Sequence, residues 1–344
     1  MTKPVTLKDI ARETGVHVST VSRALDPNAR TSLTTEVVER IRAAAERMGY
    51  RPNRLASGLR TKRTMTVGLM LPDIANTLFP PIVRGVESIL EPKGYASIIV
   101  NTDSDREREG KLVDVLLQRG VDGIIHAAPY RTDPRMVAVS RQGMPMVTVN
   151  RQIENSQIPA VINDDPGGIS EMLHYLYDAG HRRIAHIAGP QTLSTGRDRM
   201  EAFKKAVQDL GLNLPENAIA ISSHFDEDEG RRCTRDLLES GWKFTAILCA
   251  NDRLALGAID ELNRRGLSCP DDVSVTGYND IPFLDLIPPG LTTIRIQQFD
   301  AGRMSAELLV KMMTEPEATI PRTTILPVKL IERGSVKRIK PDRS

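Results

Sequence analysis

The sequence predicts a small all-α domain followed by a larger α/β core, and three observations support this fold class. In the first 50 residues, apolar side chains recur at helical spacing between glycines and polar loops. From Thr66 onward, apolar strand-like runs alternate with amphipathic segments of helical period, which is typical of parallel sheets covered by helices. The chain of 344 residues is also longer than a single hydrophobic core usually supports, which indicates two or three domains.

The N-terminal head is expected to contain three helices. Thr6 and Asp9 have the spacing of a capping box at the start of the first helix, and Gly15 ends it. A second helix is expected over 18–25, and a third one ends at Gly49. Two short helices joined by a tight turn fit a helix-turn-helix. The alternative is an ordinary three-helix packing unit whose polar side chains are merely solvated.

The charge of the chain is unevenly distributed. Residues 1–63 hold 13 Lys and Arg against 6 Asp and Glu, a net charge of +7, whereas the remainder holds 33 against 38, a net charge of −5. A basic head on a mildly acidic body favours a polyanionic partner for the head.

The stretch after the head is predicted to be a linker. Pro52 and Asn53 punctuate it, and a short helix from Arg54 to about Leu59 has few apolar side chains to bury. A helix of this length is marginal in water, and Gly58 costs it about 1 kcal/mol relative to alanine. We therefore expect this helix to form only against a partner.

The core is expected to form two α/β lobes, because it has too many strand-helix units for one sheet, and the main boundary is placed near residue 160. The strand-like runs are TVGLML, ASIIV, GIIHAA, MVTVN, RIAHIAG, AILCA and VSVTGY. The amphipathic helices are expected over 107–119, 168–179, 199–210 and 253–265.

Several classes of protein are disfavoured by composition and motifs. Hydrophobic residues make up 40% and charged residues 26%, and no apolar run approaches the roughly 20 residues that span a bilayer. The N-terminus has no apolar signal segment, and three cysteines without close spacing indicate reduced thiols. The nucleophile, phosphate-loop and zinc-protease motifs GxSxG, GxxxxGK[ST] and HExxH are absent from the sequence. We therefore predict no catalytic residue, no cofactor and no metal ligand.

The second helix of the head carries side chains suited to reading DNA. Val18 can contact a thymine methyl group, Ser19 can donate or accept a hydrogen bond, and Arg23 can bind the O6 and N7 atoms of guanine with its two-pronged guanidinium. In the alternative interpretation, Thr20 and Ser22 are only solvated surface residues.

Many collinear motifs resemble one family. VTLKDIARETGVHVSTVSRAL, YRPNRLASGLR, NTDSDREREGKLVDVLLQRGVDGII, AGHRRIAHIAGP, ANDRLALGAIDELNRRG and VSVTGYNDIPFLDLIPPGLTTIRI resemble segments of the LacI/GalR family of bacterial transcription regulators, from Val5 to about Gly334. The resemblance implies a helix-turn-helix head, a hinge, and a two-lobed core like that of type I periplasmic binding proteins. The implied divisions are a DNA-binding domain at 1–50, a hinge at 51–64 and a core at 65–340, with a first lobe at about 65–162 and 293–323 and a second at about 163–292 and 324–340.

The resemblance also implies which residues contact DNA. Val18 and Ser19 match the pair that varies with operator sequence, and Leu59 matches the hinge leucine that wedges into the minor groove; alternatively, Leu59 is a minor packing residue. His17 stands where serine is common at the helix cap, so we expect a weaker cap or a ring that reaches a phosphate. The implied DNA-binding residues are Thr6, His17, Val18, Ser19, Thr20, Ser22, Arg23, Asn53, Arg54, Ala56 and Leu59.

The family binds its effector between the lobes, and the resemblance carries Arg199 over as the central effector-binding arginine. Three alternatives remain open: Asn251 caps a helix, Phe79 belongs to the core, and Arg199 is a surface residue in a salt bridge. Many members have aspartate where Asn279 stands, which favours an anionic effector over a neutral sugar. The implied effector-binding residues are Pro72, Asn76, Phe79, Asn150, Arg151, Arg199, Phe225, Asn251 and Asn279.

The sequence thus predicts a ligand-responsive, sequence-specific transcription regulator that represses genes of carbohydrate or small-metabolite catabolism. Its expected partners are a near-palindromic double-stranded operator, a second copy of the chain, and a sugar or small organic acid as effector, with no membrane partner. We expect a homodimer, because the C-terminus lacks a leucine heptad, and a cytoplasmic, nucleoid-associated location. The alternatives are a solute-binding protein for a transporter and an enzyme built on two α/β lobes.

Overall fold

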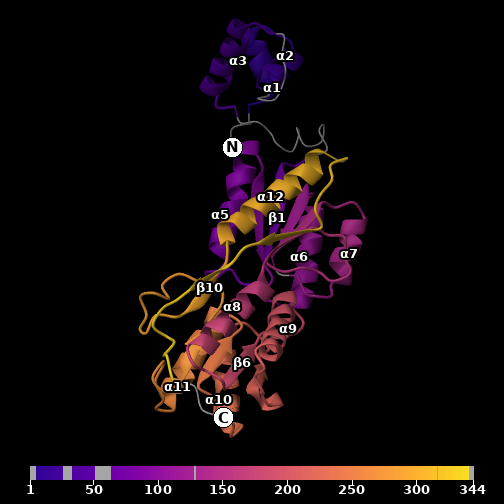
Figure 1. The fold of residues 1–344 in the computed structure, drawn as a ribbon. Helices are drawn as coiled ribbons and strands as arrows, with labels where there is room; N and C mark the ends of the chain where they lie inside the picture. Colours follow the sequence, from indigo (N-terminus) through magenta and orange to yellow (C-terminus); the bar gives the residue numbers. More distant parts are fainter. Residues whose placement is uncertain (1–4, 26–32, 51–62, 128, 316, 341–344) are drawn as a thin grey trace. The chain divides into compact units, whose positions relative to one another are not determined.

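The chain folds into two compact units, residues 1–64 and residues 65–344. A computed structural model describes residues 5–25, 33–50, 63–127, 129–315 and 317–340 (Figure 1). The fold class predicted from the sequence, a helical head and a two-lobed α/β core, is confirmed. No helix within these described ranges is long and apolar enough to cross a membrane.

The head unit is a three-helix cluster around a small apolar core. Its helices are α1 (Leu7–Thr14), α2 (Val18–Leu25) and α3 (Thr35–Arg47). Asp9 Oδ2 accepts hydrogen bonds from the backbone N–H and the hydroxyl of Thr6, at 2.9 and 2.7 Å, at the start of α1. Gly15 ends α1 at a φ of 68°, which costs a residue without a β-carbon little. The side chains buried between the helices are Ile10, Val21, Ala24, Ile41, Ala44 and Ala45.

The first lobe of the core is a six-stranded parallel sheet in the order β11-β5-β4-β3-β1-β2. Its strands are β1 (Thr66–Leu71), β2 (Ala96–Asn101), β3 (Gly123–His126), β4 (Met146–Val149), β5 (Ala160–Asn163) and β11 (Thr323–Leu326). The helices of this lobe are α5 (Phe79–Leu90), α6 (Arg106–Gln118), α7 (Pro134–Arg141) and α12 (Gln298–Thr314), and the 3-10 turn η1 (Glu91–Lys93) follows α5.

Two helix pairs cover the two faces of this sheet. Apolar side chains of α6 and α7, such as Val113 and Met136, pack with Ile124 of β3 in one buried cluster. Helices α5 and α12 pack closely against each other (Figure 1). Glycine is required at this crossing, because a β-carbon at Gly85 would lie 2.0 Å from the carbonyl oxygen of Phe299.

The second lobe is a four-stranded parallel sheet in the order β7-β6-β8-β9. Its strands are β6 (Ile184–Ala188), β7 (Ile219–Ile221), β8 (Ala246–Cys249) and β9 (Ser274–Thr276). Its helices are α8 (Asp165–Asp178), α9 (Ser194–Asp209), α10 (Glu227–Glu239) and α11 (Asp252–Arg264), with the 3-10 turn η2 (Glu216–Ala218) before β7.

A two-stranded antiparallel ribbon of β10 (Thr293–Arg295) and β12 (Lys329–Ile331) lies where the chain crosses between the lobes. The expected lobe limits at 293 and 323 therefore shift. Residues 293–295 pair with β12 instead of joining the first sheet, and β11 continues the first sheet to Leu326. Short apolar runs of equal length do not reveal which distant strand they pair with, and this explains the difference.

Helix α9 begins five residues before the expected start at 199. Its first turn contains Ser194, Thr195 and Gly196, which carry no apolar repeat that a periodicity could detect. A β-carbon at Gly196 would lie 2.1 Å from the carbonyl oxygen of Pro190, so this turn packs against its own loop.

Candidate functional site

The second helix of the head presents a polar face. His17, Ser19 and Arg23 are exposed, whereas Val18, Thr20 and Ser22 are half-buried. The Nε atom of Arg23 donates a hydrogen bond to the carbonyl oxygen of Ser19 at 3.3 Å, one turn earlier in α2. The exposed face of α2 thus combines small hydroxyl side chains with one guanidinium.

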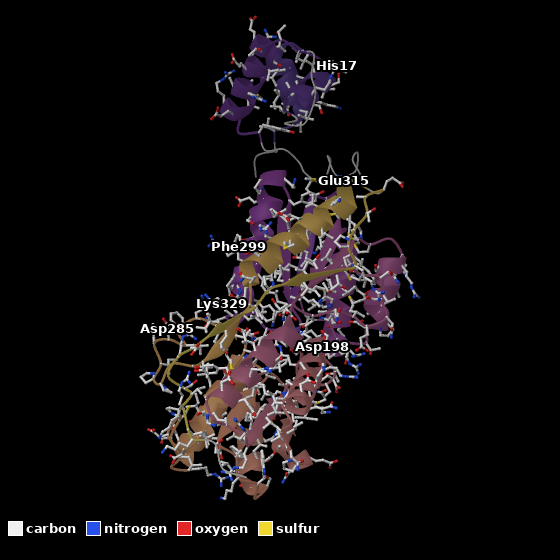
Figure 2. All side chains as sticks on the ribbon, in the orientation of Figure 1. His17, Asp198, Asp285, Phe299, Glu315 and Lys329 are labelled. Carbon is white, nitrogen blue, oxygen red and sulfur yellow. The ribbon has the colours of Figure 1, made fainter. Side chains whose placement is uncertain are left out.

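His17 takes the cap position of α2. Its Nδ1 atom accepts a hydrogen bond from the backbone N–H of Ser19 at 3.3 Å and lies 2.8 Å from the Ser19 hydroxyl. The imidazole therefore does for this helix what a serine oxygen does at other caps. An Nδ1 atom that accepts a hydrogen bond leaves the ring proton on Nε2, and His17 lies at the surface of the head unit (Figure 2).

The remaining DNA-contact candidates differ in what the structure says of them. Thr6 is exposed, and its hydroxyl donates a hydrogen bond to Asp9 in the capping box of α1. The hinge candidates Asn53, Arg54, Ala56 and Leu59 lie outside the described residues.

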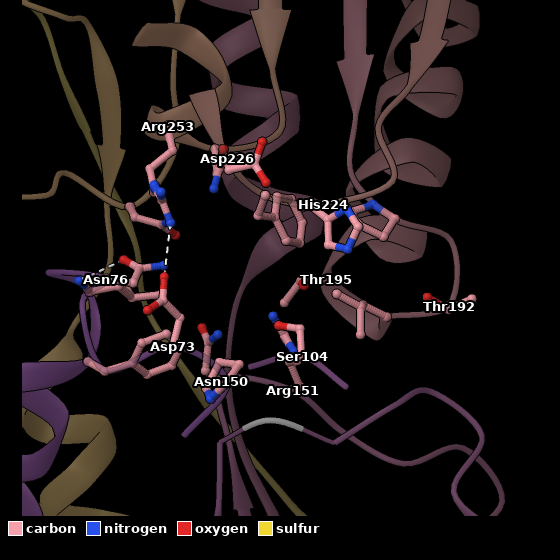
Figure 3. A pocket seen from close by; sticks show the side chains of 18 of the residues that line it. Asp73, Asn76, Ser104, Asn150, Arg151, Thr192, Thr195, His224, Asp226 and Arg253 are labelled. Atoms are coloured by element: carbon pink, nitrogen blue, oxygen red, sulfur yellow. Dashed lines mark hydrogen bonds and ion pairs between the residues drawn. The ribbon is translucent and has the colours of Figure 1, made fainter. Parts of the chain in front are cut away.

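A cavity of about 420 Å³ lies between the two lobes of the core, at the carboxyl ends of their strands. Figure 3 shows Asn150 and Arg151 on the wall formed by the first lobe, and Asp226 and Arg253 on the wall formed by the second. Ligands bind at this edge in open α/β sheets. All nine effector-binding candidates line the cavity: Pro72, Asn76, Phe79, Asn150, Arg151, Arg199, Phe225, Asn251 and Asn279.

Two asparagines of the lining have a strained backbone. Asn150 has a φ of 67° and Asn279 a φ of 121°, and each follows or closely follows a strand that ends at the cavity. Residues other than glycine adopt positive φ at a cost that concentrates at functional sites. The Oδ1 atom of Asn279 is buried and has no hydrogen-bond partner among the described residues.

Asn251 and Phe79 each have the structural role that was left open as an alternative, and both also line the cavity. The Oδ1 atom of Asn251 accepts the backbone N–H of Leu254 at 2.8 Å, so Asn251 caps α11. Phe79 is the first residue of α5 and belongs to the apolar core. The Phe225 ring fits against Gly189, where a β-carbon would lie 2.3 Å from its Cζ atom.

Arg199 is held inside the protein rather than at its surface. Its Nε and Nη2 atoms donate to Asp165 Oδ1 at 3.1 and 2.9 Å, and its Nη1 atom donates to the carbonyl oxygen of Ala250 at 2.7 Å. Its guanidinium lies 3.8 Å from the centre of the Tyr278 ring, and the residue is 2% exposed. Arg199 therefore does form a salt bridge, but the alternative that places this salt bridge at the surface is wrong, because the pair is buried. Arg199 lies in the second turn of α9.

Arg253, which sequence reasoning missed, joins the two lobes across the cavity. Its Nη1 atom lies 3.2 Å from Asp73 Oδ2 in the loop after β1, and its Nε and Nη2 atoms donate to the carboxylate of Glu227 at 2.8 and 2.7 Å. The pairing with Asp73 spans 180 residues of sequence, so no local pattern could have revealed it. The other lining residues that were missed are Leu78, Asp103, Ser104, Tyr130, Pro190, Thr192, Leu193, Thr195, Ser223, His224 and Asp226.

A buried polar cluster of Glu109, His126 and Asp133 lies within the first lobe and was also missed. Ligand-type atoms of the three side chains lie within 4.8 Å of one another, and His126 Nε2 is 3.6 Å from Glu109 Oε1. Burial raises the pKa of Asp133 to about 6 and lowers the pKa of His126 to about 4. The pKa of Glu109 is likewise raised by burial. None of the three is among the residues that line the cavity.

Comparison with known proteins gives matches along nearly the whole chain. The model of the family described as bacterial regulatory proteins, lacI family, matches residues 6–53, and that of a periplasmic binding protein-like domain matches residues 173–336. The ribose operon repressor of Halalkalibacterium halodurans is 32% identical over 96% of this chain and 97% of that protein. The catabolite control protein A of Priestia megaterium is 32% identical over 97% of this chain and 99% of that protein.

Two solved structures illustrate the likeness in three dimensions. The lac repressor dimer bound to operator and the anti-inducer ONPF matches with a TM-score of 0.86 and 27% identity, over 97% of this chain and 100% of that chain. A LacI family transcriptional regulator from Enterococcus faecium with bound ribose matches with a TM-score of 0.69 and 30% identity, over 80% of this chain and 100% of that one.

Proposed function

Because the chain belongs to the lacI family of bacterial regulatory proteins, we propose that it is a ligand-responsive, sequence-specific repressor of genes for carbohydrate or small-metabolite catabolism. One observation carries the proposal. The same chain has an exposed polar helix in a basic head and a polar cavity between two lobes, and all nine expected effector residues line that cavity. The relatives named ribose operon repressor and catabolite control protein A support the repressor role.

The head supplies DNA recognition through α2. Arg23 reads one guanine of each half-site, and Val18 and Ser19 contact neighbouring bases. The hinge residues Asn53, Arg54, Ala56 and Leu59 contact the operator, with Leu59 as the wedge that enters the minor groove and bends the duplex. The protein works on the nucleoid in the cytoplasm.

The regulator is a homodimer that reads a near-palindromic operator, because two-fold protein symmetry is mirrored in the site. Large apolar side chains are exposed on the core, including Phe283, Leu286 and Phe299. Phe299 and Pro282 line one hollow together with Pro80 and Pro81 of α5. Exposed apolar patches of this kind mark protein interfaces. The solved lac repressor is a dimer bound to operator.

The cavity between the lobes takes a small effector, a sugar or a small organic acid. The regulator from Enterococcus faecium, which resembles this chain, was solved with bound ribose. An effector changes operator affinity only if it binds the DNA-competent and the incompetent arrangements of the lobes with different affinity.

The test is to select operators from a random duplex pool with the full chain and then titrate the selected duplex at 50–200 mM salt. We expect a near-palindromic consensus and an affinity that falls steeply with salt. The variant Arg23→Ala should lose base preference at one position of each half-site. The matched control is Arg12→Ala, which removes an 81% exposed guanidinium from α1 and should keep the preference. A pool that yields no consensus would contradict the proposal.

A further inference from the structure

Three arginines line the cavity among the described residues, and two of them have carboxylate partners within the protein. Arg199 is paired with Asp165, and Arg253 is paired with Glu227 and Asp73. Arg151 makes no hydrogen bond and no ion pair with any described residue, and its buried Nε atom has no partner. It is nevertheless only 7% exposed.

An isolated buried guanidinium is an unfavourable arrangement. Moving a charge out of water costs several kcal/mol unless a partner of opposite charge and hydrogen bonds compensate for it. Burial lowers the pKa of Arg151 to about 10, so the side chain stays charged near neutral pH. A bound anion would compensate for this cost by pairing with the guanidinium.

The nearest acidic groups do not fill this role. Glu109 interacts electrostatically with Arg151 but lies beyond ion-pair distance, in the buried cluster with His126 and Asp133. Asp133 Oδ1 accepts the backbone N–H of Met136 at 3.0 Å, and ligand-type atoms of Glu109, His126 and Asp133 lie within 4.8 Å of one another. No ion pair joins Arg151 to this cluster among the described residues, and Arg151 lines the cavity whereas the three cluster residues do not.

The acids of the cavity wall are also engaged elsewhere. Asp73 is paired with Arg253, and Asp103 is paired with Arg108 at 3.0 Å. Asp226 caps α10 by accepting the backbone N–H of Glu229 at 2.9 Å.

The rest of the lining suits a hydroxylated ligand body. Four asparagines contribute amide donors and acceptors, Ser104 and Thr195 contribute hydroxyls, and the rings of Phe79, Tyr130 and Phe225 offer apolar faces. The neutral amide of Asn279 adds no negative charge that would repel an anion.

We propose that the effector is an anionic, polyhydroxylated small molecule whose carboxylate or phosphate group binds the guanidinium of Arg151. This inference rests on the proposed function, since it names the class of ligand that the effector cavity takes. The anionic oxygens accept charge-assisted hydrogen bonds from Arg151, and the hydroxyl groups face the asparagine amides.

The binding test uses matched compounds that differ in charge: ribose, ribonate and ribose 5-phosphate, and glucose, gluconate and glucose 6-phosphate, with inorganic phosphate and sulfate as minimal anions. Thermal unfolding and calorimetric titration are measured on the full chain. We expect stabilisation by at least one anionic compound and none by its neutral parent, and the two anion types separate a carboxylate from a phosphate effector. Arg151→Gln should weaken that binding at least tenfold. The control Arg135→Gln, which removes a surface arginine of α7 paired with Asp114, should leave binding unchanged.

A second measurement needs no ligand. Arg151→Met removes a charge without a partner, so the melting temperature of the ligand-free protein should rise or stay level. Arg199→Met leaves Asp165 without its partner and should lower it. If Arg151→Met lowers the melting temperature as much as Arg199→Met does, Arg151 has a structural role and the inference is wrong.

The outcomes separate this inference from the proposed function. If an operator is selected but only neutral sugars bind, the function stands and the anionic effector is excluded. If the anions bind equally to Arg151→Gln, the function stands and Arg151 is excluded as their binding group. If no operator is selected while the anions bind through Arg151, the regulator is excluded and the anion site stands. Absence of any Arg151-dependent stabilisation by the eight compounds contradicts the inference.

Discussion

Replacing Arg199 with methionine should lower the free energy of unfolding of the core by about 3–5 kcal/mol, the usual cost of breaking a buried ion pair from one side. The geometry of this pair places the expected loss at the upper end of that range. Two donors of Arg199 reach one carboxylate oxygen of Asp165, a third reaches the carbonyl oxygen of Ala250, and both charged side chains are buried. Without Arg199, Asp165 would remain as a buried carboxylate whose pKa burial already raises.

The reasoning is tested by a double-mutant cycle with Asp165→Leu. Each single variant leaves one buried charge alone, whereas the double variant removes both, so the double variant should recover at least about 2 kcal/mol of the summed losses. Arg199→Lys should behave much like Arg199→Met, because an ammonium group cannot make the same three hydrogen bonds.

Trp242 makes the assay selective. It is the sole tryptophan in the sequence and packs against the apolar cluster of the core, so its fluorescence during urea unfolding reports the core and not the head. The control variant is Lys205→Met, which breaks an exposed ion pair with Asp209 and should change stability by less than about 1 kcal/mol. Additive single-variant effects, or a loss below about 1 kcal/mol for Arg199→Met, would refute the assignment of a strong buried pair.

Three further predictions concern DNA reading, pH and assembly. Arg23→Ala should cost about 1–3 kcal/mol of discrimination at one guanine per half-site, and an unchanged base preference in titrations of operator variants would count against it. Burial lowers the pKa of His186 to about 4 from 6.5, so its contribution to stability is present above pH 6.5 and is lost as the pH falls toward 4. The full loss is about 3 kcal/mol at 1.36 kcal/mol per pKa unit, and His186→Asn should remove that part of the pH dependence in urea unfolding at pH 7 and 4.5. Light scattering should give a dimer that Leu286→Asp, a change at a 71% exposed side chain, shifts toward monomer, and a stable tetramer would contradict the prediction.

The elements that could be predicted are those whose signal is local. Helix α2 begins at Val18 and ends at Leu25 as expected, because an apolar stripe, a glycine before it and a polar loop after it are all present in one short stretch. The alternation of strand and helix gave the α/β class for the same reason. The start of α9 could not be predicted, since its first turn carries small polar residues and is fixed by packing against the loop at Pro190.

Part of the cavity lining was predicted through the resemblance to the family, which carried over nine lining residues, whereas Arg253 and the other lining residues outside the quoted motif positions were missed. What each lining side chain does was not predictable. Asn251 and Phe79 face the cavity and also serve as a helix cap and a core residue. The backbone conformation of Asn150 gives no sign in the sequence beyond the tolerance of asparagine for positive φ.

Among the three arginines that line the cavity, carboxylate partners within the protein determine which one is available to a ligand. Arg199 pairs with Asp165, which is 34 residues away in the sequence, and Arg253 pairs with Asp73, which is 180 residues away. Arg151 finds no carboxylate within ion-pair distance among the described residues. The residue type alone does not distinguish the three, because a guanidinium at a strand end or helix start suits a hydroxyl, a carboxylate or a salt bridge equally well. Once two of them are neutralised by the fold, the third fixes the sign of the charge that a ligand must bring, and so the class of effector follows from the residue that the fold leaves without a partner.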